Sequence, residues 1–201
     1  MTVHAHTTRR PRRMLRRTLA ALAALCLTAT SCGDSESMYC RYPCRFVFNP
    51  ATHASSAALL TTVGTPGTFC TVSRVTKGGA SYYHFVTTDG ISDDVIFTME
   101  DQRSTVLIGL NNAIVFGYGN VDDPPVLYAY DMECPNCFDP EAIPVRSHQI
   151  RTAQTGMATC PTCHRQYNLN TGGNVVGGDQ GKQLSRYRAH YAPGGVLSVI
   201  N

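Results

Sequence analysis

Two Cys-Pro-x-Cys motifs are the residues of this 201-residue chain best suited to chemistry. They are Cys134-Pro-Asn-Cys137 and Cys160-Pro-Thr-Cys163, and 22 residues separate them. Two residues between cysteines let both sulfurs turn toward one ion, and neighbouring backbone N–H groups can donate hydrogen bonds to them. The two motifs, called knuckles below, therefore predict a Cys₄ site for Zn²⁺, for a single iron ion or for an iron–sulfur cluster. Disulfides or free thiols are the alternative, which an oxidising compartment would favour.

His164 directly follows the second knuckle, and three roles are open to it. Its imidazole could replace Cys163 as a ligand, support a thiolate through a hydrogen bond, or simply face solvent. Asp131 and Glu133 flank the first knuckle, and we expect them to be surface charges. Four isolated histidines receive no role: His53, His84, His148 and His190.

Three further cysteines, Cys40, Cys44 and Cys70, precede the knuckles. Outside the cytoplasm one disulfide among them is expected. We favour Cys44–Cys70, because this bridge would join the start of the folded domain to its first hairpin. The odd number leaves one thiol without a partner from this group.

The N-terminus has the features of an export signal. Residues 1–31 contain six arginines and no acidic residue, and an apolar run extends from Thr18 to Ala29. Roughly a dozen apolar residues are too few to span a bilayer but suit a secretory signal peptide. The run ends in Ala29-Thr30-Ser31-Cys32, which resembles a bacterial lipobox, in which the cysteine is diacylated and becomes the new N-terminus. We therefore predict a signal peptide over 1–31, lipidation of Cys32 and a tether over 32–44, with an ordinary signal peptide or an uncleaved anchor as alternatives.

The charge of the chain argues against a nucleic-acid-binding protein. The formal net charge is +3, but six of the 17 basic residues lie in 1–31, which leaves 11 basic against 14 acidic residues in the remainder. The remainder therefore lacks the overall basic character of nucleic-acid-binding domains. The acidic segment Gly33–Ser37 also resembles the export signals of surface-displayed lipoproteins in Bacteroides-type bacteria.

Short apolar runs that alternate with polar residues predict a small, antiparallel, mostly β domain over 45–201. Gly78-Gly79 predicts a hairpin turn, and a short helix is expected over Ala54–Thr62. The expected strands are Arg45–Phe48, Phe69–Val75, Ala80–Thr87, Val95–Met99, Thr105–Leu110, Ala113–Gly117, Val126–Tyr130, Leu184–Tyr191 and Val196–Ile200. The pattern breaks over 131–178, so both knuckles belong to an insert. Within it, we expect Ile143, Val145 and Ile150 to pack beneath the segment that joins the knuckles.

The residues after the second knuckle resemble the second half of Rieske-type [2Fe–2S] domains. The resemblance rests on Tyr167 and Asn168, on the glycine-rich turn Gly172–Gly178 and on the closing strand with Leu184 and Tyr187. It covers roughly 131–200 and implies a β sandwich or barrel with a metal-holding insert. Rieske clusters use two cysteines and two histidines, whereas Asn136 and Cys163 stand at the histidine positions here.

The absence of the two Rieske histidines changes which metal and which function we expect. Four thiolates would hold Zn²⁺, or another metal suited to a Cys₄ site, in a structural role, and a [2Fe–2S] cluster is the alternative cofactor. The chain has no hydrolase elbow, phosphate loop or dinucleotide fingerprint, which favours a non-catalytic protein. Three functions stay open: a membrane-tethered binding module of the cell envelope with an unidentified protein partner, an electron carrier, and a thiol–disulfide protein.

Overall fold

The computed structural model describes residues 38–192 and 194–201 of the chain. The predicted signal peptide, Cys32 and the first part of the predicted tether lie outside the described residues. Within this described part, no helix is both long and apolar enough to cross a membrane.

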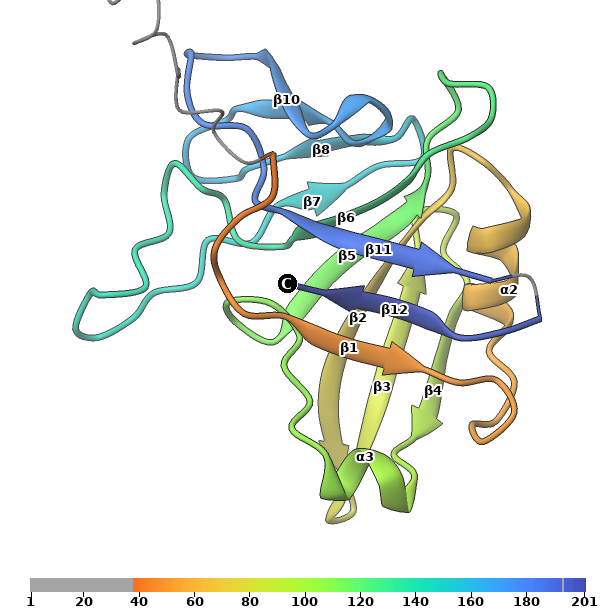
Figure 1. The fold of residues 1–201 in the computed structure, drawn as a ribbon. Helices are drawn as coiled ribbons and strands as arrows, with labels where there is room; N and C mark the ends of the chain where they lie inside the picture. The colour runs from red at the N-terminus through yellow and green to blue at the C-terminus, as the bar shows by residue number, and fades with distance from the viewer. Residues whose placement is uncertain (1–37, 193) are drawn as a thin grey trace, which may run out of the picture. The chain divides into compact units, whose positions relative to one another are not determined.

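The larger of two sheets is antiparallel throughout and has the strand order β1-β12-β11-β6-β5-β2-β3-β4 (Figure 1). Its strands are β1 (Arg45–Phe48), β2 (Phe69–Lys77), β3 (Ala80–Thr87), β4 (Ser92–Ile96), β5 (Ala113–Tyr118), β6 (Leu127–Asp131), β11 (Arg186–Tyr191) and β12 (Leu197–Ile200). Two helices, α2 (Ala57–Gly64) and α3 (Met99–Arg103), connect strands of this sheet. β2 and β3 form a hairpin at Gly78-Gly79, where both glycines have positive φ, as a two-residue turn of this kind requires.

The smaller sheet is antiparallel and has the order β10-β9-β8-β7. It consists of β7 (Arg151–Thr152), β8 (Met157–Thr159), β9 (Gln166–Asn168) and β10 (Asn174–Gly177), with the 3₁₀ turn η1 (Leu169–Thr171) after β9. These strands of two to four residues are too short to form an independent sheet. Their stability therefore depends on the larger sheet and on the contacts around the knuckles.

The larger sheet curls, so that its two ends face each other across a core. Phe46 of β1 lies 5.3 Å from Tyr83 of β3, measured between ring centroids, although these strands are far apart in the sheet order. Aromatic side chains fill most of the space between them: Phe46, Phe48, Tyr83, Phe85, Phe116 and Tyr187. This half-barrel confirms the prediction of a mostly β, antiparallel sandwich or barrel.

β5 and β6 are buried on both faces, because the smaller sheet covers their outer side. On β5, Ile114 and Phe116 point into the core of the half-barrel, whereas Val115 belongs to a second core. The second core also contains Tyr130 of β6 and Tyr167 of β9. The two strands thus fix the position of the knuckle region relative to the half-barrel.

Two expectations about individual segments are wrong. Thr105–Leu110 does not form a strand and makes only an isolated bridge between Leu107 and Arg45. Of the three residues expected to pack beneath the insert, Ile150 is buried, but Ile143 is 99% exposed and Val145 is also exposed. The loop that carries Ile143 and Val145 projects from the domain, so these side chains have no apolar surface to cover (Figure 1).

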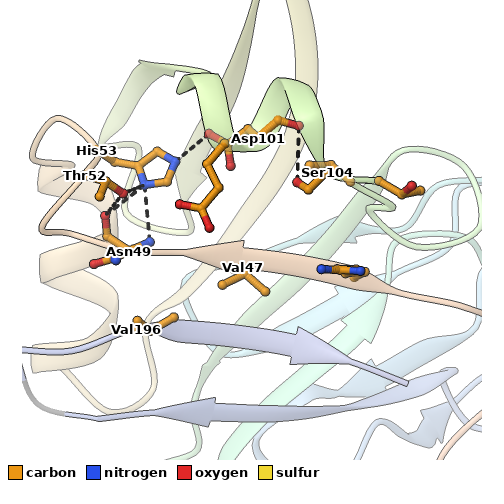
Figure 2. Close-up of a pocket in the computed structure, with 11 residues that line it drawn as sticks. Val47, Asn49, Thr52, His53, Asp101, Ser104 and Val196 are labelled. Carbon is orange, nitrogen blue, oxygen red and sulfur yellow. Dashed lines mark hydrogen bonds and ion pairs between the residues drawn. The ribbon is translucent and has the colours of Figure 1, made fainter.

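A buried polar cluster connects the turn after β1 to helix α3. Figure 2 shows His53 directed at Asp101, with 2.8 Å between Nε2 and Oδ2, beside a pocket of about 260 Å³. Asp101 also accepts hydrogen bonds from the Tyr83 hydroxyl and from the backbone and hydroxyl of Thr98. Burial raises the pKa of Asp101, but these hydrogen bonds outweigh burial and hold the pKa below its usual value. The cluster is fully hydrogen-bonded, so we assign it a structural role.

Replacing Asp101 with Asn should destabilise the domain by about 3 kcal/mol at neutral pH, because the buried donors lose a charged acceptor. The folded-state pKa is lowered, so this stabilisation exists above the ordinary pKa near 4 and disappears as the pH falls through the folded value. Urea unfolding at pH 7 and at pH 3 measures both values. Glu100→Gln, on the same helix but exposed, is the control, with a change of at most about 0.5 kcal/mol. An Asp101→Asn effect of equal size at both pH values would contradict this assignment.

Candidate metal centre

The two knuckles lie at turns that the surrounding strands position. The first knuckle follows β6, and the backbone N–H groups of Cys137 and Phe138 both donate to the carbonyl of Cys134. The second knuckle is the turn between β8 and β9, closed by a hydrogen bond from His164 N–H to the carbonyl of Cys160. Each turn is thus closed by its own backbone before any side chain is considered.

The four sulfur atoms converge. All Sγ atoms of Cys134, Cys137, Cys160 and Cys163 lie within 4.8 Å of one another. Two separations of 3.8 Å cross between the knuckles and join Cys134 to Cys163 and Cys137 to Cys160. Tetrahedral coordination with metal–sulfur bonds of about 2.3 Å requires sulfur separations of about 3.8 Å. This group could therefore hold a metal ion.

Tyr167 of β9 supports the sulfur of Cys134, a fully buried residue. Its hydroxyl lies 3.1 Å from Sγ of the fully buried Cys134, and Asn136 Nδ2 donates to the same hydroxyl oxygen at 3.0 Å. Because Asn136 supplies a proton to that oxygen, the hydroxyl proton is free to point at the sulfur. A thiolate at Cys134 thus receives a hydrogen bond within a buried environment.

The loop that leads to β11 covers one side of the site. Asn136 exchanges two hydrogen bonds with the backbone of Lys182, and Arg165 donates to the carbonyls of Asp179 and Gln180. Gly181 has no room for a side chain, because a Cβ atom there would lie 2.4 Å from Oδ1 of Asn136. The loop therefore packs directly on the first knuckle.

The electrostatics of the four thiols call for a cation. Burial raises the pKa of Cys163, but the backbone N–H and the guanidinium of Arg165 donate to its sulfur and lower that pKa to about 6. Burial raises the pKa of Cys137, and the neighbouring sulfurs raise it further. One thiolate is thus favoured, while further negative charge is opposed. A divalent ion removes this repulsion, since it attracts all four thiolates at once.

The expectation that Asp131 and Glu133 are surface charges is wrong, because both are buried. Asp131 is fully buried and accepts hydrogen bonds from the backbone of Leu110 and Glu133 and from the Tyr187 hydroxyl. Glu133 is 1% exposed and accepts from Asn111, Ser147 and the backbone of His148. Burial raises the pKa of Asp131, and its hydrogen bonds offset this only in part. Both carboxyl groups organise the chain around the first knuckle.

The remaining predicted site residues lie apart from the sulfur cluster. His164 is exposed, has the positive φ of 58° and is not among the residues whose ligand atoms converge. Its observed role is to adopt the left-handed turn that closes the second knuckle. Cys44 and Cys70 are separate, buried thiols, so the favoured bridge is not formed in the structure, and all seven cysteines of the described residues are free. Burial raises the pKa of Cys44 to about 11 and that of Cys70 to about 12, so both stay protonated at neutral pH.

Comparison with known proteins adds no relative to this picture. No protein-family model, curated protein or solved structure matches the chain. The Rieske-type resemblance stays a prediction that rests on sequence motifs. The functional argument therefore rests on the geometry of the site itself.

Sequence analysis missed the residues that support the sulfurs. In the sequence, Tyr167 is part of the family resemblance, and Asn136 stands where that family has a histidine. Neither position indicates that its side chain supports a sulfur. The contacts of Arg165 and Asn136 reach residues 179–182, and no local sequence signal reports such contacts.

Replacing Tyr167 with Phe should lower the affinity of the four-cysteine site for added Zn²⁺ by about 10- to 100-fold, since one supporting hydrogen bond to a ligand is lost while the ring is kept. Competition with a chelator of known affinity measures the change. Tyr82→Phe, which removes a hydroxyl from β3, is the matched control and should leave the affinity unchanged. Equal affinities for Tyr167→Phe and the unsubstituted protein would show that the hydroxyl does not support the site.

Proposed function

We propose that the protein is an exported, membrane-tethered lipoprotein whose β domain holds one structural Zn²⁺ on four cysteines and acts as a binding or assembly module in the cell envelope. The observation that carries this proposal is the convergence of the four sulfurs of Cys134, Cys137, Cys160 and Cys163. The proposal joins that geometry to the export features of the sequence.

The sulfur distances favour one ion over a [2Fe–2S] cluster. In such a cluster each iron takes two of the cysteines, so the two ligand pairs are set apart. Here two of the four separations that cross between the knuckles are 3.8 Å, and no pair of sulfurs exceeds 4.8 Å. Four thiolates around one centre suit Zn²⁺, which prefers tetrahedral sulfur ligands.

The surroundings of the site favour a structural role. Four protein ligands leave no open position for water or substrate, which is the property that separates structural from catalytic zinc sites. Cys134 and Cys160 are fully buried, and the 179–182 loop lies over the first knuckle. Metal binding would contribute directly to folding of the short strands β7 to β10, in addition to their packing against the larger sheet.

The proposed anchor rests on the sequence. The arginine-rich start, the short apolar run and the small residues before Cys32 are the features of a lipoprotein signal. A diacylated cysteine would hold the domain at a membrane without a spanning helix. This location supports a role in the cell envelope.

Elemental analysis of the full chain, purified without oxygen, should find one zinc per chain and no visible colour. Loss of the ion to a chelator should then expose 131–178 to hydrogen exchange before the half-barrel, because zinc binding contributes on the order of 10 kcal/mol to folding in small domains. Cys160→Ala should reproduce this loss. Cys40→Ala, which removes a half-buried thiol outside the knuckles, is the matched control.

Three results would contradict the structural zinc site. Iron with strong visible absorption would favour the [2Fe–2S] electron carrier. A disulfide within either knuckle in the native protein would favour thiol–disulfide chemistry. An unchanged melting temperature after complete removal of the metal would show that the ion does not stabilise the fold.

Replacing Cys32 with Ser should abolish acylation and release the protein from the membrane fraction of the producing cells. Mass spectrometry of the mature N-terminus and membrane fractionation measure both effects. Cys26→Ser removes the other cysteine of the N-terminal region and should change neither. An unmodified N-terminus at a different residue would disprove the anchor while leaving the metal site untouched.

A further inference from the structure

The outer face of β1, β12 and β11 carries basic and apolar side chains, and none of these three strands contains an acidic residue. Arg45 of β1 and Arg188 of β11 are both paired with Ile200 of β12, which places the three residues in one row. The next row in register consists of Val47, Ser198 and His190. We call this face the basic strip and define it by Arg45, Val47, Arg186, Arg188, His190 and Ile200.

The apolar members of the basic strip are exposed. Val47 is 40% and Ile200 is 47% exposed, and Leu107, which bridges to Arg45, is 40% exposed. Arginines beside exposed aliphatic side chains on one sheet face suit an amphipathic, negatively charged surface. Glu100 and Asp101 of α3 line a pocket together with Arg45 and Val47, at the β1 edge of the strip.

The first described residues lie directly against the basic strip. The guanidinium of Arg186 is stacked between the rings of Tyr39 and Tyr128, at 5.3 Å and 4.6 Å from their centroids, and that of Arg188 lies 4.6 Å from the ring of Tyr39. Arg186 also donates to the sulfur of Met38, and the backbone of Cys40 donates to the carbonyl of Arg186. The chain therefore enters the domain at the strip itself.

The length of the tether limits the distance between the basic strip and the membrane. Met38 follows Cys32 by six residues, and six residues span at most about 20 Å even when fully extended. If Cys32 carries the lipid, as proposed above, Met38 lies within about 20 Å of the membrane. Because Met38 contacts Arg186, the strip is held near the membrane too. A covalent link of that length also raises the effective concentration of the strip at the surface.

We propose that the basic strip docks on the anionic phospholipid surface of the membrane in which the Cys32 anchor is inserted. This inference rests on the proposed anchor for its location, and on the charge and register of the strip for its partner. The arginines contact phosphate groups, while Val47 and Ile200 enter the boundary between headgroups and acyl chains. Docking fixes the orientation of the domain, which a covalent tether alone does not.

The test uses the chain from Gly33 onward, which lacks the anchor but keeps every residue of both cores. This chain has 11 basic and 14 acidic residues, so an anionic surface repels its net negative charge. Only a local basic patch can therefore mediate binding. We expect sedimentation with equimolar phosphatidylcholine–phosphatidylglycerol vesicles, weakening with added salt, and none with phosphatidylcholine vesicles. Arg45→Gln with Arg188→Gln should lower the partition coefficient about 25-fold, since each arginine contributes about fivefold.

Arg146→Gln with Arg151→Gln is the matched control, because it removes the same charge from exposed positions outside the strip. It should change the partition coefficient less than twofold, and metal content and melting temperature should be the same for both variants. Equal losses in the two variants, binding to both kinds of vesicle alike, or no binding by the unsubstituted chain would each overturn the proposal. Failure of Cys32 lipidation would remove the anchor but would not change this vesicle result, so the two proposals fail separately.

Discussion

The four sulfur atoms of the knuckles lie within 4.8 Å of one another. Their mutual repulsion as thiolates is the constraint that the surrounding residues must satisfy. Thiolates this close cannot all form unless positive charge and hydrogen-bond donors surround them. The chain supplies several donors: the Tyr167 hydroxyl, the guanidinium of Arg165 and the backbone of the turns. These donors are too few to neutralise four thiolates, and a bound metal ion could supply the missing positive charge.

Strands β5 and β6 connect this requirement to the half-barrel. Their side chains alternate between two cores, so a displacement of either strand disturbs both. Buried Asp131 and Glu133 lie where β6 turns into the first knuckle, and their hydrogen bonds reach three other parts of the chain. Such fully satisfied buried carboxylates specify one arrangement of the backbone, even where they add little net stability. The knuckle region is thus positioned by the larger sheet rather than merely attached to it.

Much of the half-barrel could be predicted from alternation and turn residues, because each strand exposes one face to a large core. Strand β1 and the β2–β3 hairpin have almost their expected limits. Helix α3 was missed, although Thr98 and Asp101 form the capping box that signals a helix start. The strands β7 to β10 are too short to show periodicity, and the burial of Asp131 depends on Tyr187, far along the chain. The convergence of the cysteines was predictable because ligand spacing reflects the ion, whereas the supporting residues depend on tertiary contacts alone.

The pairing of β1 with β12 has a consequence for how the protein is made. Arg45 lies opposite Ile200, so β1 pairs with β12, the last strand of the described residues. Contacts between such distant segments form late, because closing a long loop costs more entropy than closing a hairpin. The half-barrel therefore cannot close until β12 has left the ribosome, although β1 emerges far earlier.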